Sequence, residues 1–286
     1  MRKFDPCYVA LSSLTPPCGA NRRWIVVKQD IRSYSMGLGV DDAGFASAAD
    51  YRSPKSPGLE TIFPGIRSII VLAYKELDSC DSPDMHVAQN GRYDLMEFSR
   101  GCNYRLARFL EREYGARTMT VPVSYPMAMS RETKGTIGQV SLRHAAVTAG
   151  LGTFGRHNLV VHPRLGSRAI FSAVLTDLDL PSDRLLESRF CTDCGLCVES
   201  CPGRALDVAG RTDVMKCIKN SQPYGLSAAV GFWGRHAEAS AEERKAMFRD
   251  DFYWKMYQAG HIGPQYFCFN CLNSCPVGRA STKMTG

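Results

Sequence analysis

Apolar residues in the first part of the chain follow helical and strand periods in turn. From Val27 to Leu38 an apolar residue recurs every three or four positions, which predicts an amphipathic helix. The run SIIVLAY at 68–74 is short and almost wholly apolar, which predicts a buried strand. Apolar positions between Leu106 and Leu110 predict a further helix, which Gly115 is placed to cap.

The next stretch continues this alternation. Residues 141–150 carry Leu and Ala at helical spacing, and strand-like runs follow at 158–163 and 168–178, joined by a turn that contains Gly166. Helices and strands thus alternate around a sheet, which predicts an α/β fold class for this part of the chain. We place a domain boundary in the segment that follows. The predicted domains are residues 1–182 and residues 183–286.

The second domain contains an insertion that is rich in aromatic residues. Phe248, Phe252 and Met256 are spaced by four, with further tyrosines beside them. This stripe predicts a helix that packs on its own core. A lid over a cofactor is the alternative interpretation.

Composition indicates an ordinary globular protein. The 286 residues are 44% hydrophobic and 22% charged, and no apolar stretch approaches the length of a membrane span. The N-terminal sequence lacks the apolar core of a secretory signal, so we predict a cytoplasmic protein without a membrane partner. The formal net charge of +7 permits an anionic partner, but the basic residues are dispersed along the chain.

The cysteines carry the strongest chemical signal. Cys191, Cys194, Cys197 and Cys201, followed by Pro202, have the spacing C-x2-C-x2-C-x3-C-P that binds [4Fe–4S] clusters in bacterial ferredoxins. Zinc or disulfides are the alternatives, but two C-x-x-C pairs would leave several cysteines without a role. Four further cysteines complete a set of eight, enough for two clusters. They are Cys217, Cys268, Cys271 and Cys275.

The two cysteine loops are expected to exchange ligands. In two-cluster ferredoxins the fourth cysteine of such a run binds the other cluster. The second loop has only three cysteines, so the lone cysteine between the loops must supply the missing ligand. We assign Cys191, Cys194, Cys197 and Cys275 to one cluster, and Cys201, Cys217, Cys268 and Cys271 to the other.

The segment GLGTFG at 150–155 matches the G-x-G-x-x-G pattern of dinucleotide-binding folds. That pattern works when a strand enters the glycines and a helix leaves them. Here a predicted helix enters and a predicted strand leaves, so we reject the dinucleotide hypothesis. The glycines still allow close approach of the backbone to a flat or bulky ligand.

The segment HAAVTAGLGTFGRHNLVVHPRLGSRAIFSAVLTDLDLP, followed by CTDCGLCVESCPGRAL, a lone cysteine and CFNCLNSCP, resembles the epoxyqueuosine reductase family. That family is related to the reductive dehalogenases. The resemblance implies a nitroreductase-like α/β domain that binds base-off cobalamin. It also implies a ferredoxin-like domain with two [4Fe–4S] clusters. By motif match, the corrin would lie near Gly150, Gly152, Gly155, Arg156, His157 and Asn158.

The chain departs from the family in two places. The resemblance implies an aspartate that donates a proton shortly before the AGLG segment, but no Asp or Glu occurs from Lys134 through Phe154. Glu132 and Tyr125 are the candidate proton donors in its place. The sequence also ends soon after Cys275, which makes it a short, divergent member. From these departures we do not expect tRNA to be a partner.

The sequence therefore predicts an oxidoreductase. In this hypothesis two [4Fe–4S] clusters pass electrons to a base-off corrinoid that reduces a small electrophilic substrate. The electron donor would be a low-potential protein such as a ferredoxin or flavodoxin. The alternative is an electron-transfer or corrinoid-carrying protein without turnover of its own.

Overall fold

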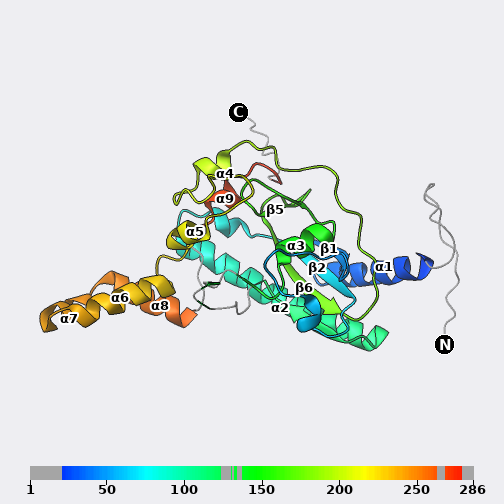
Figure 1. The fold of residues 1–286 in the computed structure, drawn as a ribbon, viewed down its shortest axis with the longest axis horizontal. Coiled ribbons are helices and arrows are strands. Elements are labelled where there is room, and N and C mark those ends of the chain that lie inside the picture. The colour runs from blue at the N-terminus through cyan, green and yellow to red at the C-terminus, as the bar shows by residue number, and fades with distance from the viewer. Residues whose placement is uncertain (1–20, 124–129, 131, 134–136, 263–267, 279–286) are drawn as a thin grey trace.

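The structure is a computed structural model that describes residues 21–123, 130, 132–133, 137–262 and 268–278 (Figure 1). Its centre is a four-stranded sheet in the order β1-β2-β6-β3, in which every neighbouring pair is antiparallel. The strands are β1 (Asp42–Ser47), β2 (Ser68–Lys75), β3 (Thr118–Val121) and β6 (Ala169–Thr176).

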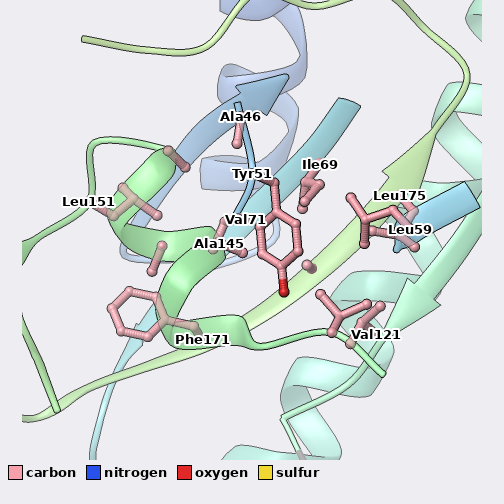
Figure 2. Close-up of a cluster of buried hydrophobic side chains, with 14 of the residues drawn as sticks. Ala46, Tyr51, Leu59, Ile69, Val71, Val121, Ala145, Leu151, Phe171 and Leu175 are labelled. Atoms are coloured by element: carbon pink, nitrogen blue, oxygen red, sulfur yellow. The ribbon is translucent and has the colours of Figure 1, made fainter. Parts of the chain in front are cut away.

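Both faces of this sheet are covered. Helices α1 (Asn21–Gly37) and α2 (Met85–Tyr114) pack on one face through a buried apolar cluster. Helix α3 (Leu142–Thr148) and the loops after β1 cover the other face. Figure 2 shows Tyr51 over this second face, close to Ile69 and Val71 of β2. A strand buried on both sides needs apolar residues at successive positions, which explains the unbroken run in β2.

Two short 3₁₀ helices and a small hairpin complete the α/β body. The helices are η1 (Leu59–Thr61) and η2 (Asp78–Asp81), and the hairpin pairs β4 (Thr153–Phe154) with β5 (Val160–Val161). The cysteine-rich module contains α4 (Leu196–Glu199), α5 (Val214–Ser221) and α9 (Asn270–Asn273). Between α5 and α9, helices α6 (Leu226–Glu238), α7 (Ala241–Met247) and α8 (Asp251–Ile262) extend from the body as an arm (Figure 1).

Most predicted elements are confirmed, with shifted limits. The predicted helix at Leu106 is the end of α2, and Gly115 caps it in the left-handed conformation at φ 63°. Helix α2 begins much earlier because the Asp84 carboxylate accepts hydrogen bonds from the backbone N–H groups of His86 and Val87. The predicted strand at 158–163 shortens to two residues in β5, and strands β1 and β3 were not predicted.

The aromatic insertion forms its own small core, as predicted. The rings of Phe248, Phe252 and Tyr253 lie 5.6–6.4 Å from the ring of buried Phe232 in α6. The expected single helix is divided, because Phe248 ends α7 and α8 begins at Asp251. Within the residues that the structure describes, no helix is long and apolar enough to cross a membrane.

The segment after the sheet stays attached to β1. The backbone N–H of Asp183 donates a hydrogen bond of 2.8 Å to the backbone oxygen of Phe45. The backbone N–H of Phe45 donates one of 3.1 Å to the Asp183 carboxylate. This carboxylate also accepts a hydrogen bond of 2.8 Å from Arg32. The predicted domain boundary between residues 182 and 183 stays a prediction. Asp183, the first residue after it, still contacts strand β1.

The close approach of β1 to α3 generates a stability prediction. A Cβ atom at Gly44 would lie 2.4 Å from the backbone oxygen of Ala149, so backbone has to move in a Gly44→Ala variant. We expect this variant to lose about 1–3 kcal/mol in the free energy of unfolding, the usual cost of overpacking. Chemical denaturation under anaerobic conditions measures the loss. Gly37→Ala is the control, because a Cβ there meets nothing within 4 Å. Equal midpoints for the two variants would contradict the packing account.

Candidate cofactor and metal site

The two cysteine loops lie against each other, although 66 residues lie between Cys201 and Cys268 in the sequence. Helices α4 and α9 are in contact, and the Ser200 hydroxyl lies 3.0 Å from that of Ser274. The Asn270 side chain donates a hydrogen bond of 3.1 Å to the backbone oxygen of Ser200. Gly195, at φ 82°, gives the first loop the left-handed turn that starts α4.

One group of thiols gathers around Cys197. Burial raises the pKa of the Cys197 thiol, and the neighbouring thiols of Cys191, Cys275 and Cys194 raise it further. Three of these cysteines belong to the first loop and one to the second. This is the first of the two ligand sets that the spacing predicted.

A second group gathers around Cys271. Burial raises the pKa of this thiol to about 12, with contributions from Cys268, Cys217 and Cys201. The pKa of Cys217 is likewise raised by burial and by Cys268 and Cys201. The Cys197 thiol also raises the pKa of Cys271, but by less than the other three thiols do. These four thiols are the second predicted set.

The thiols fit an iron–sulfur cluster in their arrangement. In the described part of the chain, no three His, Cys, Asp or Glu side chains converge as ligands of one metal ion. A [4Fe–4S] cubane does not need such convergence, because each of its four thiolates binds a different iron atom. Backbone N–H groups point at two of the sulfurs, as Arg156 N lies 3.4 Å from Cys191 Sγ and Ala205 N lies 3.3 Å from Cys201 Sγ.

The second loop is also fixed to the α/β body. The Ser167 hydroxyl donates a hydrogen bond of 2.9 Å to the backbone oxygen of Leu272. The Asn273 side chain donates to the backbone oxygen of Cys80 at 2.5 Å and accepts from the Cys80 thiol at 3.3 Å. Burial raises the pKa of Cys80 to about 11, so this cysteine stays a neutral thiol. The loop is therefore held in place from both sides.

A cavity of about 1480 Å³ lies between the α/β body and the cysteine-rich module. It is larger than the range of roughly 300–1,000 Å³ that is usual for ligand pockets. Phe154, Val140 and Met96 provide apolar wall, and the start of α3 provides polar groups. The cysteine-rich module closes the opposite side with residues 204–216, where the lining residues are Arg204, Ala205, Asp207, Val208 and Gly210–Lys216.

Positive charge predominates around this cavity. The described lining residues include six Lys or Arg and three Asp or Glu side chains. Arg92 is paired with buried Glu76 at 2.6 Å, and Arg143 donates a hydrogen bond to the backbone oxygen of Asn158 at 2.5 Å. The other four basic side chains are exposed. They are Lys55, Arg204, Arg211 and Lys216.

The predicted corrin-binding glycines lie behind the cavity wall. Gly150 has φ 68°, and a Cβ atom there would lie 2.5 Å from the backbone oxygen of Arg184. A Cβ atom at Gly152 would lie 2.5 Å from a methyl group of Val160. Close packing within the body thus accounts for both glycines, and neither lines the cavity in the described structure.

The other predicted residues of this segment divide between the two sides of the hairpin. A Cβ atom at Gly155 would lie 2.8 Å from the ring of His157, which is buried. Burial lowers the pKa of His157 to about 4, so its ring is neutral at pH 7. Arg156 faces the first cysteine loop, whereas Asn158 and Phe154 line the cavity.

Of the two predicted proton donors, Glu132 lines the cavity. A hydrogen bond with Ser130 lowers the pKa of its exposed carboxyl group, so the ionised form predominates at neutral pH. Tyr125 lies outside the described residues.

Sequence reasoning missed His144, which also lines the cavity. Its ring lies 5.0 Å from the ring of Phe154, and Nδ1 lies 2.7 Å from the Ser141 hydroxyl. Burial and the charge of Arg143 lower its pKa. Only the position of His144 at the start of a helix beside the AGLG segment could have drawn attention to it.

Comparison with known proteins agrees with this geometry. Residues 188–207 match the family model described as a 4Fe-4S binding domain. The epoxyqueuosine reductase of Bacillus cereus is 25% identical over 214 residues, which are 67% of this chain and 55% of that protein. The chain thus spans about half the length of the relatives it matches.

Two solved structures share the fold. A crystal structure of epoxyqueuosine reductase with a tRNA-Tyr stem loop matches with a TM-score of 0.59 and 20% identity, covering 90% of this chain and 66% of that one. A reductive dehalogenase structure described as suggesting a mechanism for B12-dependent dehalogenation matches with a TM-score of 0.53 and 19% identity. That match covers 67% of this chain and 28% of the dehalogenase.

These matches correct one prediction and confirm another. The prediction that tRNA is not a partner is wrong, because the matched epoxyqueuosine reductase is one with a tRNA stem loop. The absence of an upstream aspartate bears on proton transfer, and it says nothing about the basic side chains around the cavity. The α/β fold with a 4Fe-4S domain is confirmed. The chain is similar in sequence to epoxyqueuosine reductases, and it shares its fold with an epoxyqueuosine reductase and a reductive dehalogenase.

Proposed function

We propose that this chain is an iron–sulfur reductase that uses two [4Fe–4S] clusters and a base-off cobalamin. The observation that carries the proposal is the wall shared by the thiol loop and the cavity. The hairpin of β4 and β5 lines the cavity with Phe154 and Asn158, and its turn donates a hydrogen bond to Cys191. A single hairpin would therefore separate electrons held at that loop from a ligand in the cavity.

The cavity fits a corrinoid in size and in the character of its walls. Its volume of about 1480 Å³ leaves room for a large cofactor and a substrate together. When bound, the corrin cobalt supplies a strongly reducing centre, which is chemistry that the side chains cannot provide. Phe154, Val140 and Met96 would hold the apolar faces, while Ser141 and Asn158 offer hydrogen bonds.

The side chains of this chain would control protons around the substrate. Glu132 is ionised at neutral pH, so it needs a less polar environment in the complex before it donates a proton. His144 is neutral and is oriented by Ser141 through its Nδ1 atom. Both line the cavity, and Glu132 and Tyr125 remain the proposed donors from the sequence.

The alternative function is an electron-transfer or corrinoid-carrying protein. It shares the clusters and the cavity with the reductase, so cofactor content does not separate the two. Turnover does. A reductase consumes a low-potential donor such as a ferredoxin or flavodoxin only when its substrate is present, whereas a carrier passes electrons to a second enzyme.

The ligand exchange between the cysteine loops is tested by iron analysis. Protein purified without oxygen should contain about eight irons per chain, four for each cubane. Cys201→Ala should perturb the cluster held by Cys217, Cys268 and Cys271, and leave an EPR signal from the other cluster. The control is Cys102→Ala, a buried cysteine of α2 outside both sets. Stoichiometric zinc, or loss of the Cys191 cluster in Cys201→Ala, would refute the assignment.

Cobalamin binding is tested by filling the cavity. Met96 of α2 lines the wall, and Met96→Trp adds bulk there. We expect a loss of about five- to 150-fold in cobalamin affinity, since overpacking costs about 1–3 kcal/mol and 1.4 kcal/mol is a factor of ten. The visible spectrum of bound cobalamin reports both affinity and the base-off form. Met36→Trp, at the exposed end of α1, is the control. If the unmodified chain binds no cobalamin at high micromolar concentration, the corrinoid proposal fails.

An RNA-borne substrate is a second proposal, favoured by the basic residues around the cavity. We expect a tRNA stem loop to bind there through phosphate contacts. Arg204→Gln combined with Arg211→Gln should weaken binding and reduce the slope of log K against log salt by about one to two. Arg108→Gln combined with Arg112→Gln, on the exposed end of α2, is the control. A slope that is unchanged in the first pair would count against RNA at this site.

A further inference from the structure

Arg156 joins the cavity wall to the first cysteine loop. It lies in the turn between β4 and β5, two positions before the cavity-lining Asn158. Its backbone N–H points at Cys191 Sγ from 3.4 Å. Its backbone oxygen accepts a hydrogen bond of 3.0 Å from Gly210, in the segment that lines the opposite side of the cavity. The main chain of Arg156 is thus fixed to the cysteine-rich module at two points.

The side chain of Arg156 turns toward the same loop. Its Nη1 atom lies 3.3 Å from Oδ1 of Asp193, which stands between Cys191 and Cys194. Asp193 adopts a positive φ of 56°, a conformation that aspartate tolerates better than most residues. The Nε atom of Arg156 is buried and has no hydrogen-bond partner within the described ranges. The guanidinium therefore contacts a ligand-bearing loop without full compensation of its polar groups.

The two charges of this pair are unequally screened by water. The Arg156 side chain is 27% exposed, whereas that of Asp193 is 61% exposed. Water weakens the field of the carboxylate more than that of the guanidinium. We therefore expect the guanidinium to act on the first cysteine loop more strongly than the carboxylate does.

A positive field acts on the reduction of an iron–sulfur cluster. Reduction adds one negative charge, so a nearby cation stabilises the reduced form and raises the potential. We propose that Arg156 is a positioning residue that sets the reduction potential of the cluster bound through Cys191, and that Asp193 opposes it. This inference rests on the cluster ligation in the proposed function, but it does not depend on cobalamin or on turnover.

The consequence is a difference between the two clusters. A higher potential at the Cys191 cluster favours its reduction by the cluster held through Cys271.

The test is a redox titration monitored by EPR on protein purified without oxygen. Arg156→Gln removes the charge and keeps the backbone N–H, so we expect the potential of the Cys191 cluster to fall. Asp193→Asn removes the opposing charge, and we expect that potential to rise. A change of about tenfold in the reduction equilibrium corresponds to about 59 mV for a one-electron couple. The signal of the other cluster should move less in both variants.

Two controls separate charge from structure. Arg156→Lys retains the charge and should keep the potential close to that of the unmodified chain. Arg184→Gln removes a charge from a side chain that is 85% exposed and should have no effect. Iron content is measured for each variant. If Arg156→Gln loses its cluster, the direction of the potential shift in Asp193→Asn still tests the inference.

The outcomes are distinct from those that test the proposed function. If the unmodified chain holds two clusters and neither variant moves the potential, this inference alone is overturned. It is also overturned if Arg156→Lys shifts the potential as far as Arg156→Gln does. An unmodified chain without clusters would overturn the proposed function itself, and a chain with clusters but no cobalamin would leave the inference standing.

Discussion

The constraint on which the rest of this structure depends is the crowding of thiols between two loops that are distant in the sequence. Burial and mutual repulsion raise the pKa of the Cys271 thiol to about 12, and they raise that of Cys197 as well. Eight thiolates in so small a space are unfavourable unless cations neutralise them. In the proposed function iron provides that compensation, and metal binding would then contribute to the folding free energy of the module. The short helices α4 and α9 supply little core of their own, which makes this contribution important.

The same module completes the cavity. Residues 204–216 follow the first cysteine loop directly and form the wall opposite α3. The second loop is held to the body by Ser167 and Cys80, and it contacts the first loop through α9 and α4. The module that carries the thiols therefore also forms one wall of the cavity. A reductase benefits from this coupling, because the electron source and the ligand site are positioned by the same contacts.

The sequence revealed the parts of the site that depend on spacing. Cysteines at fixed intervals indicate ligation whatever the surrounding fold, so the spacing alone led to the two ligand sets. The sets stay predictions, which the mutual effects of the thiols on their pKa values support. Strand β2 was predicted because burial on both faces leaves an unbroken apolar run. Strand β1 was missed, since Gly44 and its small neighbours become a strand through pairing with β2 and packing against α3. Local sequence carries little trace of such tertiary contacts.

The cavity lay beyond sequence reasoning for a related reason. Its walls come from segments as distant as Ser53, Met96, His144 and Lys216, and no local pattern connects them. The GLGTFG segment was the one part with a signal, yet Gly150 packs against Arg184 and Gly152 against Val160. Of this segment only Phe154 lines the cavity. Charge was misjudged as well. Basic residues that are dispersed in sequence gather around one opening in the fold.

The most direct test of this account is a crystal structure of the chain purified without oxygen, with data collected at the iron absorption edge. The account predicts two separate iron sites of cubane size. Cys275 should complete the site of Cys191, Cys194 and Cys197, and Cys201 should bind the other. A single iron site, or Cys201 bonded to the same cubane as Cys191, would contradict it.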